Sequence, residues 1–216
     1  MFASQQGEDV FLNHNIFKNK RKGVYIELGA LDGALYSNTK FFEDYLKWTG
    51  ILIEPHPEKF KLLQQNRPNN YLFNDLVSCH KTPLKYRYFV DDLAAVSGVE
   101  NTLSQHHFET YFDNDAKKSL PQATTLIKPK TLTEIVKTTD LKHIDLLSLD
   151  VEGHEHEVLQ SWDFSIPIDV ILIETLCVQP EKDELCRQIL LNNNYKFITK
   201  YKWNEIFALE SFTIHM

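Results

Sequence analysis

The sequence contains few of the residues that break a chain or crosslink it. Among its 216 residues there are only 7 glycines, 8 prolines and 3 cysteines, and the cysteines are far apart and form no CxxC pair. This composition argues against disordered and fibrous classes. The odd number of separated cysteines also makes a disulfide framework or a zinc site a poor interpretation. We therefore expect structural free thiols in a reducing compartment at Cys79, Cys177 and Cys186.

Long apolar runs and an excess of positive charge are also missing. No apolar segment approaches the roughly 20 residues that span a bilayer. The N-terminus, MFASQQGEDVFLNHNIF, lacks the basic start and apolar core of a signal peptide. The formal net charge of −7 offers no general attraction for nucleic acid or for anionic membranes. We expect a soluble, cytoplasmic protein with no membrane span and no nucleic-acid partner, and the oligomeric state stays open.

Short apolar runs alternate with amphipathic stretches, and 43% of the residues are hydrophobic, which suits the core of a single domain over residues 1–216. Runs typical of strands are Val24–Leu28, Ile51–Ile53, Tyr71–Val77, Leu84–Val90, His143–Val151, Ile168–Thr175, Lys196–Tyr201, Glu205–Leu209 and, left open, Phe212–His215. Helical spacing of apolar residues occurs at Thr39–Trp48, Pro57–Asn66, Thr131–Thr138, Glu155–Trp162 and Glu181–Leu191.

This alternation predicts a doubly wound α/β fold with a mostly parallel sheet that is covered on both faces. The last strands follow one another after a short link, which predicts an antiparallel C-terminal hairpin. Residues 91–125 are less regular and rich in Ser, Asn, His and acidic residues. We expect them to form a lid or acceptor-site insertion.

In such a sheet, ligands bind beyond the carboxyl ends of the strands, near the point where strand order reverses. Gly29 and Gly33 follow the first strand, where they let the backbone turn tightly and approach a ligand. The loop matches neither GxGxxG nor GxxxxGK[ST], which disfavours nicotinamide and nucleotide-triphosphate binding. Glu54 follows the second strand, where a carboxylate can accept bonds from both ribose hydroxyls. An ordinary β-to-α turn and a solvated glutamate remain the alternatives.

The densest polar cluster, DVEGHEHE, begins at Asp150, directly after a strongly apolar strand. We expect Asp150 at the floor of the cleft, whereas the helix dipole alone accounts for Glu155. The cluster lacks the HExxH spacing of zinc proteases. Asp150 and Glu174, at adjacent strand ends, are candidate oxygen ligands for a hard divalent ion such as Mg²⁺ or Mn²⁺.

Four segments together resemble the FkbM-type methyltransferases, a branch of the S-adenosylmethionine-dependent superfamily: SQQGEDVF, VYIELGALDGALYSNTKFFE, GILIEPHPEKFKLLQQNRPN and IDLLSLDVEGHEHEVLQSWDF. They spread over about residues 4–162, and IDVILIET and NEIFAL extend the resemblance to nearly the whole chain. The combination of ELGxxDGxxxSNT, IEPxPxxFxxLxxNRPN and DxEGxExxVL is specific. The resemblance implies a seven-stranded sheet of the class I methyltransferase (Rossmann-like) type and S-adenosyl-L-methionine as cofactor.

The resemblance also implies roles for single residues. It places Glu27, Gly29 and Gly33 around the methionine part of the cofactor, Ser37, Asn38 and Thr39 at its carboxylate, Glu54 at the ribose, Asp75 and Leu76 at the adenine, and Gln5 and Asp9 in an N-terminal segment folded over it. Asp150 and Glu152 would face the transferred methyl group or the acceptor. His154 stands where the family often has a small residue, so it is a candidate base for this chain alone.

Family members mostly methylate hydroxyl oxygens, often of sugars or polyketides, which predicts an O-methyltransferase that modifies a sugar or glycan. A sugar hydroxyl needs a base or a metal to react. Asp150 is the first candidate, as base or metal ligand, and His154 the second. The basic residues of Lys85–Tyr88 suit the phosphate of a nucleotide sugar, whereas Tyr86 and Tyr88 fit better as ordinary half-buried strand residues.

Three other functions remain as alternatives. A nucleic-acid methyltransferase is disfavoured by the negative net charge and by the absence of an NPPY-like motif. A non-catalytic module that keeps the cofactor pocket is disfavoured by the intact acidic residues at the strand ends. A different α/β enzyme that uses a dinucleotide would show itself by binding NAD in place of S-adenosylhomocysteine.

Overall fold

Seven strands form the main sheet of the computed structural model, which describes residues 2–90, 93–175 and 177–213. Their order is β3-β2-β1-β7-β8-β10-β9. Only β10 runs antiparallel to its neighbours, and it pairs with β8 and β9. The bounds are β1 Val24–Leu28, β2 Thr49–Ile53, β3 Tyr71–Phe73, β7 Ile144–Leu149, β8 Ile168–Glu174, β9 Tyr195–Tyr201 and β10 Asn204–Leu209. The predicted doubly wound, mostly parallel sheet and its antiparallel C-terminal pair are confirmed.

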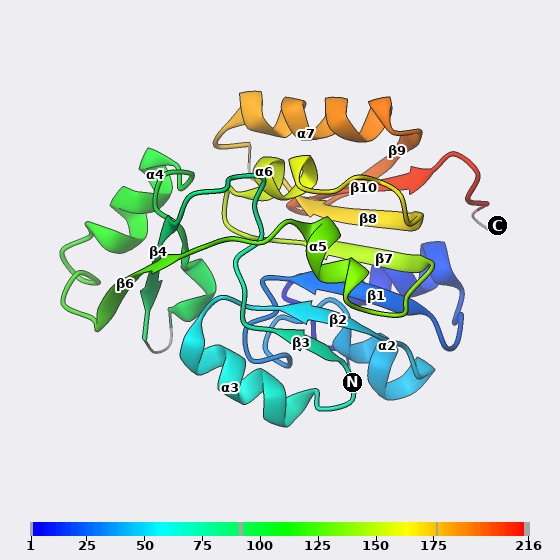
Figure 1. Cartoon of the computed structure of the whole chain (residues 1–216), viewed down its shortest axis with the longest axis horizontal. Coiled ribbons are helices and arrows are strands. Elements are labelled where there is room, and N and C mark those ends of the chain that lie inside the picture. The colour runs from blue at the N-terminus through cyan, green and yellow to red at the C-terminus, as the bar shows by residue number, and fades with distance from the viewer. Residues whose placement is uncertain (1, 91–92, 176, 214–216) are drawn as a thin grey trace.

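Helices cover both faces of this sheet, and the central strands are therefore apolar throughout. All six residues of β7 are buried. In β8, Ile171 and Ile173 pack into one core cluster, and Val170 and Leu172 pack into the other. The first cluster includes residues of three helices: α5 Leu132–Lys137, α6 Glu155–Gln160 and α7 Pro180–Asn192. The second cluster includes residues of α1 Glu8–Leu12, the π-helix Asn13–Phe17, α2 Lys40–Leu46 and α3 Pro57–Asn66. Figure 1 shows α7 beside the β8–β9 end of the sheet and α3 beside β3.

A second, three-stranded sheet lies beyond one end of the main sheet, on the left in Figure 1. It has the order β5-β4-β6 and is antiparallel. The segment around it contains β4 Leu84–Phe89, the 3₁₀-helix Ala94–Val96, β5 Gly98–Val99, α4 Gln105–His107, the π-helix Phe108–Phe112 and β6 Gln122–Ile127.

The second sheet differs from the sequence interpretation in two ways. The strand expected at Leu84–Val90 exists but belongs to this sheet. Lys85 is exposed between the buried Leu84 and Tyr86, which suits an antiparallel strand with one solvated face. The expected insertion 91–125 contains most of β6, whose half-exposed polar residues gave no strand signal. Asp91 and Asp92 lie outside the described residues.

Three further differences concern one strand that is shorter than expected, one helical segment that was not predicted and one strand that was left open. The strand expected at Tyr71–Val77 ends at Phe73, and Val77 forms only an isolated bridge with Lys130. The N-terminal helical segment was not predicted. Of the strand left open at the C-terminus, Phe212 and Thr213 are not in a strand, and the rest lies outside the described residues. No helix in the described part of the chain is long and apolar enough to cross a membrane.

The order of the strands in the main sheet indicates where a ligand would bind. The chain runs outward from β1 to β3 and then returns to β7 on the opposite side of β1. Strand order therefore reverses between β1 and β7. In open α/β sheets, the crevice at the carboxyl ends of the strands at such a point is where ligands bind.

Candidate functional site

A cavity of about 390 Å³ lies at this switch point, within the usual size range of small-molecule sites. Its walls include residues that follow β1, β2, β7 and β8, and the segment of the three-stranded sheet forms the opposite wall. Eleven of the residues singled out in the sequence line it: Gln5, Glu27, Gly29, Asn38, Glu54, Asp75, Leu76, Asp150, Glu152, His154 and Glu174. Four others, Asp9, Gly33, Ser37 and Thr39, do not line it.

The two glycines after β1 have different surroundings. Gly29 lines the cavity with φ +76°, and a Cβ there would lie 2.0 Å from the backbone oxygen of Asp150. Gly33 also has φ +76°, but a Cβ there would meet Leu63 at 2.5 Å and Arg67 at 2.6 Å. Gly33 thus lets its loop pack closely on the end of α3, and it does not face the cavity.

Glu27 is held by the segment that opens α2. Its carboxylate accepts bonds from Ser37 Oγ at 2.9 Å, from the Asn38 backbone N–H at 2.8 Å and from Thr39 Oγ1 at 2.5 Å. The side chain is buried, with 3% of the residue exposed. Ser37 and Thr39 therefore position Glu27 from behind the cavity wall, while Asn38 lies on the wall itself.

Arg67, which the sequence analysis did not single out, lies behind the same wall and is fully buried. Its Nη1 lies 3.9 Å from Glu27 Oε2 and donates to the Gly33 carbonyl at 2.8 Å. Nε pairs with Glu43, and Nη2 donates to the Tyr25 hydroxyl at 2.7 Å. The only sequence signal was its place in the NRPN end of a family segment. Arg67 joins the β1 carboxylate to the glycine loop and α2.

Glu54 is preorganised by backbone groups. Its oxygens accept bonds from the Leu31 N–H at 2.8 Å and the His56 N–H at 2.7 Å, and Asn74 Nδ2 donates to its backbone oxygen at 2.7 Å. Burial raises the pKa of Glu54 to about 7. Each carboxylate oxygen keeps a second lone pair, so the side chain can still accept bonds from a ligand in the cavity.

Of the remaining candidate cofactor-binding residues, some line the cavity and one supports the wall from behind. Asp75 and Leu76 line the cavity, and the Asp75 carboxylate pairs with Lys130 Nζ at 2.9 Å. Gln5 lines the cavity, but Asp9 is fully buried and accepts bonds from the Ala3 N–H at 2.7 Å and from nearby groups of the N-terminal segment. Asp9 therefore holds the segment that carries Gln5.

The carboxylates at the ends of β7 and β8 form a partly buried cluster. Carboxylate oxygens of Asp150 and Glu174 lie within 4.8 Å of each other, and burial raises the pKa of Asp150 to about 6. Burial also raises the pKa values of Glu152 and Glu174 well above their ordinary range. Glu155 belongs to the cluster as well, since ligand oxygens of Asp150, Glu155 and Glu174 lie within 4.8 Å of one another. The sequence interpretation had assigned Glu155 only to the helix dipole.

His154 is buried beside this cluster and lines the cavity. The Thr102 hydroxyl donates to the Val99 carbonyl, so its 3.1 Å contact with His154 Nδ1 requires Nδ1–H to be the donor. Nε2 is then an acceptor, and it has no partner among the described residues. Burial lowers the pKa of His154 to about 4, so the ring is neutral near pH 7.

His107 of α4 lies in the segment expected to form a lid or acceptor-site insertion, and it contacts the cluster directly. Its Nε2–H donates to the Val96 carbonyl at 2.9 Å. Nδ1 is therefore an acceptor and lies 3.4 Å from Glu152 Oε2. Burial lowers the pKa of His107, which favours a neutral ring against a protonated Glu152.

The basic residues of β4, expected to bind a phosphate, do not line the cavity. Lys85 and Arg87 both pair with Glu100, at 3.6 and 3.4 Å. The Arg87 guanidinium also stacks on two aromatic rings of the π-helix that follows α4. Alternation along the strand explains this, since Tyr86 faces the cavity while its two neighbours point to the other side. Tyr86 is buried, more than the half-buried strand residue expected.

The fold is that of a Rossmann-like α/β domain. It has a cofactor-sized cavity at its switch point, with acidic side chains at the carboxyl ends of the strands. Residues 27–197 match the family model described as the methyltransferase FkbM domain, and the chain belongs to that family. The resemblance found in the sequence is confirmed, and the chain is an S-adenosylmethionine-dependent methyltransferase.

Two solved structures are similar to the chain at low sequence identity. A TehB-like SAM-dependent methyltransferase from Corynebacterium glutamicum has a TM-score of 0.48 and 9% identity, with 94% of this chain and 87% of that chain covered. The precorrin-6y C5,15-methyltransferase from Geobacter metallireducens has a TM-score of 0.41 and 11% identity, with 88% and 82% covered. No curated protein matches the chain.

Proposed function

We propose that this methyltransferase moves the methyl group of S-adenosylmethionine to a hydroxyl oxygen of a sugar or glycan. One observation carries the proposal. Proton-accepting side chains, Asp150 and His154, line the same cavity as Gly29 and Glu54, which follow the strands on the opposite side of the switch point. A cofactor held at the β1–β2 side would meet an acceptor held at the β7 side.

The cavity suits the cofactor in the chemistry of its donor set. Glu54, Asp75, Leu76, Gln5 and Asn38 all line the cavity. Glu54 would accept bonds from the two ribose hydroxyls, Asp75 and Leu76 would hold the adenine, and Gln5 and Asn38 would hold the methionine part. The bound cofactor supplies a methyl group already activated on a sulfonium. What remains for the chain is to align the acceptor oxygen with it and to take up the hydroxyl proton.

Asp150 is the proposed proton acceptor. Its raised pKa of about 6 leaves it mostly ionised at neutral pH and close enough to working pH to be an effective base. His154 is the second candidate, because its Nε2 is a buried acceptor without a partner among the described residues. Glu152 lies beside both and bounds the acceptor end of the cavity.

A divalent cation is a separate proposal. Asp150 and Glu174 were its candidate ligands from the sequence, and the proximity of Glu155 supports a third oxygen ligand. Mg²⁺ or Mn²⁺ there would lower the pKa of the acceptor hydroxyl. We expect dialysis against a chelator to abolish methyl transfer, and Mn²⁺ to restore it in the wild type but not in Glu174→Gln. Full activity after chelation would rule the cation out.

The main test is methyl transfer from labelled S-adenosylmethionine to sugars, glycans and RNA, with binding of S-adenosylhomocysteine and NAD measured by calorimetry. The proposal expects S-adenosylhomocysteine to bind, and a sugar or glycan to be methylated in preference to RNA. The Asp150→Asn variant should bind S-adenosylhomocysteine and lose methyl transfer. Full activity in that variant would contradict the role of Asp150, and cofactor binding without turnover on any acceptor would indicate a binding module.

A further inference from the structure

Exposed apolar side chains gather at the mouth of the cavity. Four large apolar residues that line it are each 44% to 48% exposed: Leu35, Tyr36, Val178 and Trp203. They come from three separate places in the chain, namely the loop before α2, the loop between β8 and α7 and the turn between β9 and β10. Single exposed apolar residues need no explanation, but a group that borders a cavity indicates a binding surface. We call these four residues the rim.

Trp203 occupies a position where a bulky residue is unusual. Tyr201 pairs with Asn204, so the turn between β9 and β10 consists of Lys202 and Trp203 alone. Lys202 has φ +55°. Two-residue hairpin turns favour Gly, Asn or Asp, and neither residue of this turn is one of them. A residue that departs from a local rule without a packing gain is a candidate for function, which singles out the half-exposed indole of Trp203.

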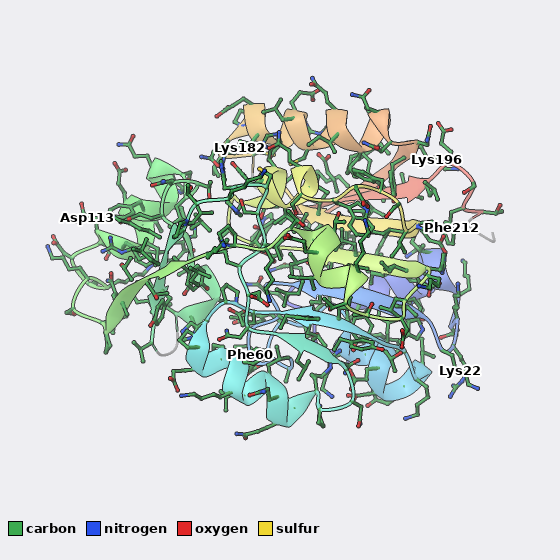
Figure 2. The ribbon with its side chains drawn as sticks, in the orientation of Figure 1. Lys22, Phe60, Asp113, Lys182, Lys196 and Phe212 are labelled. Atoms are coloured by element: carbon green, nitrogen blue, oxygen red, sulfur yellow. The ribbon has the colours of Figure 1, made fainter. Side chains whose placement is uncertain are left out.

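The turn that carries Trp203 lies at the end of the cavity proposed for the acceptor. Figure 2 shows Lys196, near the start of β9, at the end of the main sheet away from the three-stranded sheet. Strand β9 therefore runs toward the cavity, and its turn lies beside the carboxyl end of β8. There the Trp203 carbonyl accepts from the Thr175 N–H at 2.7 Å, directly after Glu174. Trp203 thus stands beside a strand end that contributes to the carboxylate cluster.

Tyr36 is connected to the same hairpin through the N-terminal segment. Ser4 forms a parallel bridge with Tyr36, and the Tyr201 hydroxyl donates to the Gln6 carbonyl at 3.2 Å. Residues 4–6 therefore join the loop before α2 to the hairpin that carries Trp203. Tyr36 also has φ +59°, a strained conformation for a bulky residue that tends to occur at functional sites.

The two aromatic rings of the rim are free to receive a ligand. Neither Tyr36 nor Trp203 stacks on another aromatic ring in the described part of the chain. Among the described residues, the Tyr36 hydroxyl and the Trp203 indole N–H also have no hydrogen-bond partner. Each ring therefore offers a flat apolar face and a polar edge. A sugar ring is complementary to both, because its C–H groups can lie on the aromatic face while a hydroxyl bonds to the edge.

The size of the cavity leaves the rim for a second part of the acceptor. Its volume is about 390 Å³, near the lower end of the roughly 300 to 1,000 Å³ that hold one drug-sized ligand. S-adenosylmethionine is itself a ligand of that size, so there is room beside it for the group that reacts and for little more. Any further part of the acceptor then meets the rim.

We infer that the rim binds a second ring of the acceptor, adjacent to the ring that is methylated, by stacking on Trp203 and Tyr36. The acceptor is then a glycan of two or more sugar residues rather than a free monosaccharide. This inference rests on the proposed function and narrows it from a sugar or glycan to a glycan. A hydrocarbon chain fits the rim less well, because it would leave the polar edges of both rings unpaired.

Quenching of tryptophan fluorescence tests the inference directly. Trp203 is the exposed one of the three tryptophans, because Trp48 and Trp162 are only 1% and 5% exposed. Acrylamide quenching of the full chain loaded with S-adenosylhomocysteine is compared between methyl glucoside and methyl maltoside, methyl galactoside and methyl lactoside, and methyl mannoside and methyl mannobioside. We expect at least one disaccharide to reduce the quenching constant about twofold relative to its monosaccharide. Equal quenching within every pair would overturn the inference, as would protection of Trp203 by S-adenosylhomocysteine alone, which would assign the rim to the cofactor.

Substitutions in one hairpin provide a matched comparison of methyl transfer. Trp203→Ala should lower kcat/KM for the disaccharide about tenfold more than kcat/KM for its monosaccharide, and Trp203→Phe, which keeps a stacking ring, should restore most of that difference. Phe197→Ala is the control, because Phe197 is 50% exposed on β9 and does not line the cavity. Its ratio of the two kcat/KM values should equal that of the wild type. Equal losses on both acceptors in Trp203→Ala would show a merely structural role for Trp203.

The outcomes separate this inference from the proposed function. A wild-type protein that methylates each monosaccharide as efficiently as the matching disaccharide would overturn the inference and leave the proposed function intact. Failure of S-adenosylhomocysteine to bind would instead contradict the proposed function itself.

Discussion

A Cβ placed on Gly29 would lie 2.0 Å from the backbone carbonyl oxygen of Asp150. This contact joins the loop after β1, where the cofactor is proposed to bind, to the loop after β7, which carries the proposed base. The two loops belong to neighbouring parallel strands on either side of the switch point. The absence of a side chain at Gly29 therefore sets the spacing between the two halves of the site.

Gly29→Ala should be much more damaging than a chemically equal change at Gly7. Both glycines have positive φ, at +76° and +87°, but a Cβ at Gly7 meets only the Tyr201 hydroxyl at 3.3 Å. The left-handed conformation costs an alanine about 1 kcal/mol at either site, and overlap with the rigid Asp150 backbone adds about 2 kcal/mol at Gly29. Urea unfolding of both variants, with S-adenosylhomocysteine affinity, measures the difference. Equal destabilisation would contradict the contact.

Arg67→Met should destabilise the protein by about 3 to 5 kcal/mol, because it leaves Glu27 and Glu43 without their buried cation. Lys40→Met, which removes a surface pair with Asp44, is the matched control and should cost less than about 0.5 kcal/mol. Affinity for S-adenosylhomocysteine should also fall in Arg67→Met, since Arg67 contacts the Gly33 carbonyl of the glycine loop. A loss of stability comparable to the control would argue against a buried ion network.

The ligand-free protein should lose stability as the pH rises. Burial raises the pKa of Glu54 from 4.5 to about 7, so the native state binds more protons than the unfolded state in this range. The contribution of Glu54 is full below about pH 4.5 and is lost as the pH rises through 7, up to roughly 3 kcal/mol. Thermal unfolding between pH 5 and 8 should show a shallower decline for Glu54→Gln than for the wild type. Parallel curves would contradict the raised pKa.

The dependence of kcat on pH distinguishes the two candidate bases. With Asp150 as base, kcat rises with pH and reaches half its plateau near pH 6, where the carboxyl group loses its proton. With His154 as base, kcat is constant above about pH 5, because the pKa of the ring is about 4. We expect the first profile in the wild type and in His154→Gln. A wild-type profile without an inflection between pH 5 and 7 would exclude Asp150.

The main elements were predictable from local pattern. The bounds of β1 and α3 agree with the prediction, because continuous apolar runs and a proline at the first helical position are strong local signals. The β6 strand was missed because its half-exposed Gln and Thr residues lack an apolar run. Gly29, Glu54 and Asp150 were identified as ligand-facing from their places after strands, and all three line the cavity, whereas Gly33 of the same loop does not.

The sequence by itself determined the strands of the main sheet and the helices between them, the family, and the acids at the strand ends, since these depend on neighbours along the chain. Only the tertiary structure decided how each acid is used. Glu27 is neutralised by Arg67 and Asp75 by Lys130, while Asp150 and Glu174 are left together without a lysine or arginine partner among the described residues. Pairing depends on distances between side chains from different elements, and folding alone sets those distances.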